Sequence, residues 1–201
     1  SFLCGWTVIY NKVENEYYYG CSAKIKIPDE IIEKTDKSVA KILNLKNVRE
    51  LVEGQDVGYS LTTFEQKYQK EILYVRKKDI VIPVAVGTGG FNIMYIENEP
   101  KERYVYNNSC FVLRIKEDII SSKFVYLQLS TSKVQEKVLS NAKGTLIKHI
   151  TKKDILSIEI PDLENEKIKE ICRKYDNIKN KETKLKYEKQ QFWDSLNKLY
   201  N

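Results

Sequence analysis

The last 38 residues constrain the fold most, because an apolar residue recurs there at every seventh position. The series consists of Ile171, Ile178, Leu185, Phe192 and Leu199. The segment 164–201 contains neither glycine nor proline and is rich in lysine and glutamate. Heptad spacing on a polar background is typical of a long helix that packs against another helix. We therefore predict one long C-terminal helix over 164–201.

A second position of the same heptad completes the stripe. It is occupied by Ile168, Tyr175, Glu182, Lys189 and Leu196. The stripe spans about 32 residues, or roughly 48 Å of helix. A helix this long cannot bury such a stripe against itself, so we expect a partner helix from a second copy or from a second half of a longer protein. Packing onto its own globular domain is the alternative. The opposite charges of Glu182 and Lys189 would weaken the seam but set its register and direction.

Residues 1–163 have a different sequence pattern, in which short strand-like runs alternate with turns. Strand patterns occur at 17–27, 39–45, 71–75, 79–86, 91–96, 103–106 and 110–115. The sequence "GTGG" at 87–90 predicts a hairpin turn. The fold class is therefore α+β, with a sheet-rich globular domain (1–163) followed by one long coiled-coil-forming helix (164–201).

Two helical segments are also expected before the boundary, which lies at Pro161. The spacing of apolar residues changes to that of a helix from Lys123 to Leu139, with a break at Ser130–Ser132. Thr151 is placed to cap a short helix that has Asp154 at its third position.

Composition and motifs exclude several classes of protein. No apolar run approaches the roughly 20 residues that span a membrane, and "SFLCGWTVIY" (1–10) is too short for a signal peptide and lacks its basic residues. The cysteines form no C-x-x-C pair and lie near no histidine cluster; they are Cys4, Cys21, Cys110 and Cys172. We therefore expect a cytoplasmic protein with reduced thiols, no metal site and no cofactor. The net charge of +6 permits nucleic-acid binding.

One basic stretch stands out as a candidate binding surface. It contains the chain's single histidine and no acidic residue before Asp154; its candidate contacts are Lys143, Thr145, Lys148, His149, Lys152 and Lys153. Gly144 permits a close backbone approach. These groups predict contacts to the phosphates of a nucleic acid. An ordinary solvated loop is the alternative. A catalytic role for His149 is disfavoured, because no Ser, Cys or Asp stands at a recognisable spacing from it.

Sequence motifs do not support an enzyme. "VGTGG" lacks the pattern of a phosphate-binding loop and precedes a strand-like run. Asp162 with Glu182 and Lys184 copies the PD…ExK pattern of metal-dependent nucleases. That chemistry needs convergent carboxylates, whereas the second half of this pattern lies some 30 Å along the predicted helix. We therefore predict no catalytic site in this chain.

The order of these segments resembles the DNA-specificity subunits of type I restriction–modification enzymes. "GTLIKHITKKDILSIEIP" (144–161) is similar to that family's Gly-x-x-x-Lys stretch, short helix and Ile-x-Ile-Pro strand, which precede a long helix. Four further segments are similar in the same order: "ILNLKNV" (42–48), "VRKKDIVIPVAVGTGGFNIMYI" (75–96), "NNSCFVLRI" (107–115) and "KFVYLQLSTSKVQEKV" (123–138). The resemblance covers about residues 39–201. It departs at Lys78, where the family has Asp or Gly before Asp-Ile-Leu, and after Pro161, where a second proline and a Glu-Gln pair are missing.

The resemblance implies a non-catalytic target-recognition domain. Such a domain reads one half of a split double-stranded DNA site and directs a partner adenine methyltransferase, and a nuclease, to that site. Family members join two recognition domains by two antiparallel helices, so this chain corresponds to half of that plan. It is then either a half-size subunit that pairs with a second copy, or the specificity region of a methyltransferase fusion. The helix residues expected at the antiparallel interface are Ile168, Ile171, Tyr175, Ile178, Leu185, Phe192, Leu196 and Leu199.

Base reading is expected from loops within residues 1–110. The side chains best suited to base edges there are Asn47, Arg49, Lys101 and Arg103. The alternative function is a protein-interaction module that docks through its helix without touching DNA. A metal-dependent nuclease is the third hypothesis. Salt-sensitive DNA binding separates the first two, and a cleavage assay with divalent metal tests the third.

Overall fold

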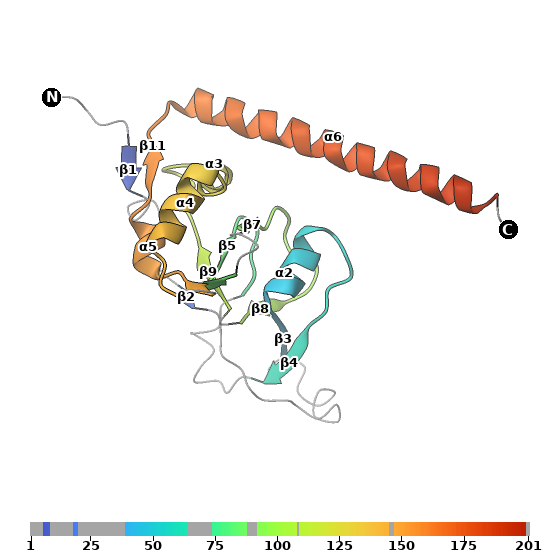
Figure 1. Cartoon of the computed structure of the whole chain (residues 1–201), viewed down its shortest axis with the longest axis horizontal. Coiled ribbons are helices and arrows are strands. Elements are labelled where there is room, and N and C mark those ends of the chain that lie inside the picture. Colours follow the sequence, from blue (N-terminus) through green and yellow to red (C-terminus); the bar gives the residue numbers. More distant parts are fainter. Residues whose placement is uncertain are drawn as a thin grey trace. The chain divides into compact units, whose positions relative to one another are not determined.

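The computed structural model describes residues 6–8, 18–19, 39–63, 74–87, 92–107, 109–144 and 147–199 of the chain. The chain divides into two compact units, Ser1–Asp162 and Leu163–Asn201 (Figure 1). The first unit carries the strands and the short helices. The second unit is built on one long helix.

The described strands of the first unit form four small sheets. The largest has the order β2 (Tyr18–Tyr19), β9 (Cys110–Leu113), β5 (Ile80–Pro83) and β7 (Met94–Tyr95), and its neighbours are antiparallel. The second has the order β4 (Ser60–Thr63), β3 (Val39–Leu43) and β8 (Tyr104–Tyr106). In this sheet β3 runs antiparallel to β4 and parallel to β8.

Two further antiparallel pairs join distant parts of the chain. They are β1 (Trp6–Val8) with β11 (Glu159–Pro161), and β6 (Ala85–Val86) with β10 (Lys148–His149). The second pair brings the basic stretch next to the residues that precede "GTGG". Neither this pairing nor the strands β1 and β4 were predicted from the sequence.

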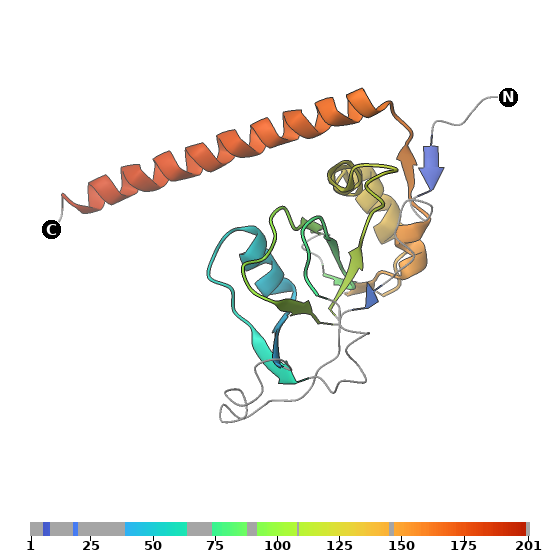
Figure 2. The ribbon, with the colours of Figure 1, turned by 180° about the vertical axis from the view of Figure 1, so that it is seen from behind.

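Five described helices complete the fold. They are α2 (Leu45–Val52), α3 (Ser122–Leu129), α4 (Ser132–Asn141), α5 (Lys152–Leu156) and α6 (Asn165–Asn197). Figures 1 and 2 show α3, α4 and α5 gathered on one side of the first unit, with α2 and the β3–β4–β8 sheet on the other. Strands β5, β7 and β9 lie between these two groups.

The helical predictions are largely confirmed. The segment 123–139 forms α3 and α4, which are separated at Ser130 and Thr131 as expected. Helix α5 has the predicted capping box, in which the Thr151 side chain accepts from the Asp154 backbone and the Asp154 carboxylate accepts from Thr151. The long C-terminal helix is present as α6. The predicted fold class, a strand-bearing globular domain followed by one long helix, is confirmed.

Helix α2 was not predicted, because the run 39–45 was interpreted as a continuous strand. The strand ends at Leu43, and Asn44 caps the helix in a reciprocal box with Asn47. One face of α2 is then apolar and packs on the core: Val48 is fully buried, and Leu51 packs against the same cluster. The signal that could have identified α2 is an Asn three residues before another Asn, followed by apolar residues at helical spacing.

The strand predicted over 79–86 is divided at Val84. Pro83 has no N–H group to continue the ladder, and the Val84 N–H donates to the Ser109 carbonyl at 3.0 Å. The Val84 carbonyl accepts from Ile150 at 2.9 Å, so the chain leaves the large sheet and pairs with β10. The hairpin predicted at 87–90 falls mostly outside the described residues, although β5 and β7 do pair antiparallel.

The other strand predictions have mixed outcomes. The runs 103–106 and 110–115 correspond to β8 and β9. The run 91–96 forms only the two-residue strand β7. Most of 17–27 and of 71–75 lies outside the described residues, and Tyr74 forms a single bridge with Val105.

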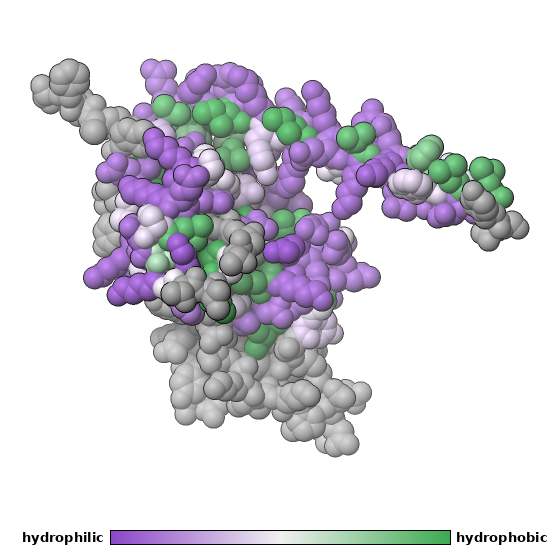
Figure 3. Space-filling model, in the orientation of Figure 1, coloured by the Kyte–Doolittle hydropathy of each residue, from purple (hydrophilic) through white to green (hydrophobic). Residues whose placement is uncertain are grey.

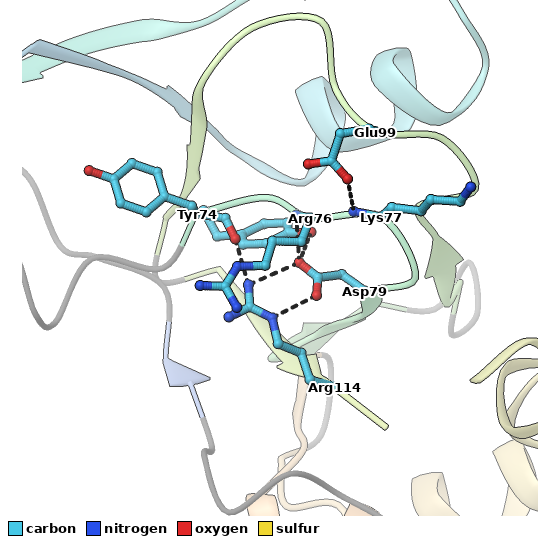
Figure 4. A network of polar contacts seen from close by, with 7 residues as sticks. Tyr74, Arg76, Lys77, Asp79, Glu99 and Arg114 are labelled. Carbon is cyan, nitrogen blue, oxygen red and sulfur yellow. Dashed lines mark hydrogen bonds and ion pairs between the residues drawn. The ribbon is translucent and has the colours of Figure 1, made fainter. Parts of the chain in front are cut away.

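A buried ion pair fixes the start of β5. Asp79 is 1% exposed, and its carboxylate receives hydrogen bonds from Arg114 Nε at 2.8 Å and from Tyr106 Oη at 3.0 Å (Figure 4). The Arg76 N–H donates to the same carboxylate at 2.9 Å. Burial raises the pKa of Asp79, and the neighbouring Arg114 opposes that rise. Because a lone buried charge is costly, the two residues depend on each other.

Lys78, next to this ion pair, has left-handed backbone geometry, with φ of 71°. The family that the sequence resembles has Asp or Gly at this position, and a positive φ favours glycine. Lys78 Nζ pairs with Glu117 at 2.7 Å. Burial alone would raise the pKa of Glu117, but hydrogen bonds from Lys78 and Ser122 lower it below its usual value.

Candidate functional site

Lys143 and His149, at the two ends of a loop in the basic stretch, are hydrogen-bonded to one another beside β6. The backbone N–H of His149 donates to the Lys143 carbonyl at 2.8 Å, and the N–H of Lys143 donates back at 3.3 Å. On its other side, His149 pairs with Ala85. The loop is therefore anchored on two sides, although its residues 145–146, including the candidate Thr145, lie outside the described residues.

Gly144 is required by the shape of this loop. Its φ is 122°, which side-chain-bearing residues rarely adopt. A Cβ atom at this position would also lie 2.0 Å from the carbonyl oxygen of Ile147. The glycine therefore lets two backbone segments meet, which differs from the expected role of bringing the backbone close to a ligand.

The cations of the basic stretch, which continues into α5, fall into two groups. The side chains of Lys143, His149 and Lys153 are exposed, so they can meet an anion without rearrangement. Lys148 and Lys152 are half-buried, and Lys148 Nζ donates to the Leu139 carbonyl at 2.8 Å. This bond uses one of three ammonium donors to satisfy a carbonyl in the last turn of α4. Lys148 therefore has a structural role in addition to the predicted phosphate contact.

The four predicted base-reading residues have different surroundings. Asn47 uses its side chain within α2, accepting from Asn44 and donating to Glu50 Oε2 at 3.0 Å. Arg49 is exposed in the last turn of the same helix. Arg103 is exposed and lies over the ring of Tyr74, with its Cζ atom 4.1 Å from the ring centroid.

Lys101 lines a cavity of about 560 Å³ between the end of α2 and the segment 96–104. Four carboxylate residues share this lining: Asp56, Glu97, Glu99 and Glu102. Such a lining repels phosphate, so Lys101 is a weaker candidate for a DNA contact than Arg103. The structure does not gather the four candidates into one cluster with the basic loop.

Sequence reasoning missed Tyr74 and the polar network behind it. Tyr74 supports Arg103 through its ring, and its carbonyl accepts from Arg114 Nη2 at 2.5 Å (Figure 4). One sequence signal could have pointed to this network. Asp79 stands at the start of an apolar strand, and a charged residue that is buried there needs a polar partner.

Helix α6 exposes most of its apolar stripe. Ile168 is the one buried residue among the described residues of this helix, and Ile171, Tyr175 and Leu196 are half-buried. The remaining apolar positions are open to water, with Leu185 66% exposed and Leu199 77% exposed. Figure 3 shows apolar residues recurring along the helix. Phe192 and Trp193 add an aromatic pair with ring centroids 5.4 Å apart.

The nuclease-like pattern is not assembled within α6. The helix is continuous from Asn165 to Asn197. Glu182 and Lys184 therefore lie about 26 Å or more along the axis from its first residue. Asp162 precedes that residue, so the three groups cannot converge within one copy of the chain. In the part of the chain that the structure describes, no helix combines the length and apolar character needed to cross a membrane.

Comparison with known proteins identifies relatives. The family model for the type I restriction modification DNA specificity domain matches residues 21–189. Among solved structures, the HsdS subunit from Thermoanaerobacter tengcongensis is 12% identical, with a TM-score of 0.57 over 91% of this chain and 44% of that one. A chain from a structural study of complex assembly and conformational transition in the type I R-M system is 16% identical. It gives the same TM-score over 99% of this chain and 44% of that one.

At these identities the structural matches show a shared fold. The chain spans less than half the length of either solved chain. No curated protein sequence matches it significantly.

Proposed function

Because the chain belongs to the family of type I restriction modification DNA specificity domains, we propose that its first unit reads one half of a split double-stranded DNA site. The family match carries this proposal, and the exposed cations of the anchored loop support it. Recognition of this kind would direct a partner adenine methyltransferase, and a nuclease, to the site. The methyl donor and the cleavage chemistry would then belong to those partners, and this chain would need no cofactor of its own.

The anchored loop is the proposed phosphate-binding surface. Lys143 and His149 are exposed at its two ends, where their backbones are hydrogen-bonded to one another, and Lys153 is exposed on α5. A cation on a fixed backbone loses less conformational entropy when it binds than a cation on a mobile loop. Contacts to phosphates supply affinity and register without selecting a sequence. We therefore assign affinity, rather than specificity, to this loop.

The exposed stripe of α6 is the proposed interface with an antiparallel helix. The two charged positions of its seam support this direction. In a parallel pair, Glu182 would face Glu182 of the other copy, and Lys189 would face Lys189. In an antiparallel pair, a register that places Glu182 opposite Lys189 of the other copy brings opposite charges together, which favours that arrangement. The partner would be a second copy of this chain or a second half of the same specificity protein.

Selection of bound sequences from a randomised duplex library tests the proposal directly. The full chain should enrich one half-site, or two inverted half-sites at a fixed spacing if it pairs through α6. A variant with Lys143 and Lys153 changed to alanine should lose affinity for all sequences while enriching the same bases. Retention of DNA without any enriched sequence would overturn the proposal.

The alternative of a protein-interaction module has one observation in its favour, which is the exposed apolar stripe of α6. A stripe of this length needs a partner whether or not the first unit binds DNA. The same selection separates the two functions. An interaction module without DNA contact would retain no duplex at low or physiological salt.

A further inference from the structure

Arg103 lies directly before β8 and is exposed, and it packs against the half-buried side chain of Tyr74. The Arg103 guanidinium lies over the Tyr74 ring at 4.1 Å. In the described part of the chain, no carboxylate forms an ion pair with Arg103. A guanidinium that packs on a ring face keeps its N–H edge available, and the contact limits the positions that this edge can take.

The backbones of the two residues are joined to one another. The N–H of Val75 donates to the Tyr104 carbonyl at 3.0 Å, and Tyr74 forms an antiparallel bridge with Val105. Arg103 and Tyr74 are 29 positions apart in the sequence, yet each lies next to a residue of this backbone pairing. The backbone pairing therefore brings the two side chains together.

The buried ion pair holds Tyr74 from behind. Arg114 Nη2 donates to the Tyr74 carbonyl at 2.5 Å, and the same guanidinium is held by Asp79 through bonds of 2.8 and 3.2 Å. Figure 4 shows the Tyr74 ring directed away from this network while its carbonyl faces Arg114. A series of contacts therefore runs from Asp79 to Arg114, from Arg114 to the Tyr74 carbonyl, and from the Tyr74 ring to Arg103.

We infer that Arg103 reads a guanine in the recognised site, and that Tyr74 and the Asp79–Arg114 pair position it. This inference rests on the proposed function. The planar fork of arginine matches the O6 and N7 acceptors of guanine, which are presented together only in the major groove. Preorganisation on Tyr74 lowers the entropy that the side chain loses on binding.

The other predicted base-reading residues are less suited to this role. The Asn47 amide is occupied within α2, and Lys101 lies among carboxylates. Among the described residues, the Arg49 guanidinium makes no cation–π contact. Arg103 is thus the candidate that is both exposed and held in place.

The test uses the half-site recovered by selection with the full chain. Each guanine is replaced in turn by 7-deazaguanine, which lacks the N7 acceptor. At one guanine, the wild-type chain should lose about tenfold in affinity, since a good bidentate contact is worth about 1–3 kcal/mol. The Arg103→Ala variant lacks the guanidinium, so it should bind more weakly than the wild type and bind the guanine and the 7-deazaguanine duplexes with about equal affinity.

Two variants test the positioning role of Tyr74. Tyr74→Phe keeps the ring, so its loss of affinity at 7-deazaguanine should equal that of the wild type. Tyr74→Leu removes the ring, so this loss should be smaller. Arg173→Ala removes one positive charge from α6 and serves as a matched control, with guanine dependence unchanged. Thermal unfolding of each variant verifies that the fold is retained.

The outcomes separate this inference from the function on which it rests. If no sequence is enriched by the wild type, both are wrong. If the wild type is specific but Arg103→Ala remains as sensitive to 7-deazaguanine as the wild type, only the role of Arg103 is wrong. If Tyr74→Leu and Tyr74→Phe lose the same affinity at 7-deazaguanine, the positioning role of the ring is wrong.

Discussion

The ammonium of Lys148 lies 2.8 Å from the carbonyl oxygen of Leu139, so a residue expected to meet phosphate also ties the basic loop to the last turn of α4. Lys153 is exposed, and no hydrogen bond of its ammonium is found among the described residues. The two lysines therefore provide a matched comparison between anchoring and binding.

Lys148→Ala should lower the free energy of unfolding by about 1 kcal/mol, the usual value of one lost hydrogen bond. Lys153→Ala should leave stability unchanged, because it removes only an exposed charge. Both variants should weaken binding to all DNA sequences and reduce the salt slope by about one. Urea unfolding and titrations at several salt concentrations measure the two effects. An unchanged salt slope in both variants would contradict the phosphate assignment.

Gly144→Ala should damage the loop, because the added Cβ would meet the Ile147 carbonyl at 2.0 Å and the backbone φ is 122°. We expect a loss of about 1–3 kcal/mol in stability and weaker DNA binding. Gly87→Ala is the matched control, since a Cβ there has no neighbour within 4 Å. Thermal unfolding measures the stability of both variants. An equal loss of stability in the two would contradict the described geometry at Gly144.

Lys78→Gly should be more stable than Lys78→Ala by about 1 kcal/mol. Both variants lose the ion pair to Glu117, so the comparison isolates the φ of 71°, which glycine adopts at little cost. Loss of the ion pair itself should change the free energy of unfolding little, because the pair is partly exposed to solvent. Denaturant unfolding measures the difference. Equal stabilities would mean that this turn carries no backbone strain.

Lys189→Glu should weaken self-association of the full chain by about tenfold if α6 pairs antiparallel with a second copy. The substitution makes both charged seam positions acidic, so opposite charges no longer meet. Mixing this variant with Glu182→Lys should restore association. In a parallel pair, the substitution exchanges one like-charge contact for another, and association would stay the same. Sedimentation equilibrium distinguishes these outcomes.

Local sequence signals predicted the parts of the fold that depend on neighbouring residues. The heptad from Ile171 to Leu199 identified α6, and the Thr151–Asp154 box identified α5. The break at Ser130 was visible as a change of spacing. In each case the residues that form the element also carry its signal.

Features that depend on distant residues were not predictable in this way. The pairing of His149 with Ala85, and the contact of Arg103 with Tyr74, join segments with no shared local pattern. Helix α2 was missed because apolar residues continue from Leu43 into Val48, and only the Asn44 cap separates strand from helix. The sequence therefore predicts the candidate site as a basic stretch, whereas the anchoring of that stretch beside β6 is visible only in the structure.

Equilibrium competition at physiological salt tests the central claim most directly. The full chain would be offered a duplex with the selected half-site and an equal-length duplex in which that site is scrambled. We predict a preference of at least about a hundredfold, since each of several mismatched pairs costs about 1–3 kcal/mol. A ratio near one would contradict sequence recognition and leave only a basic surface, and failure to bind either duplex would favour the protein-interaction module.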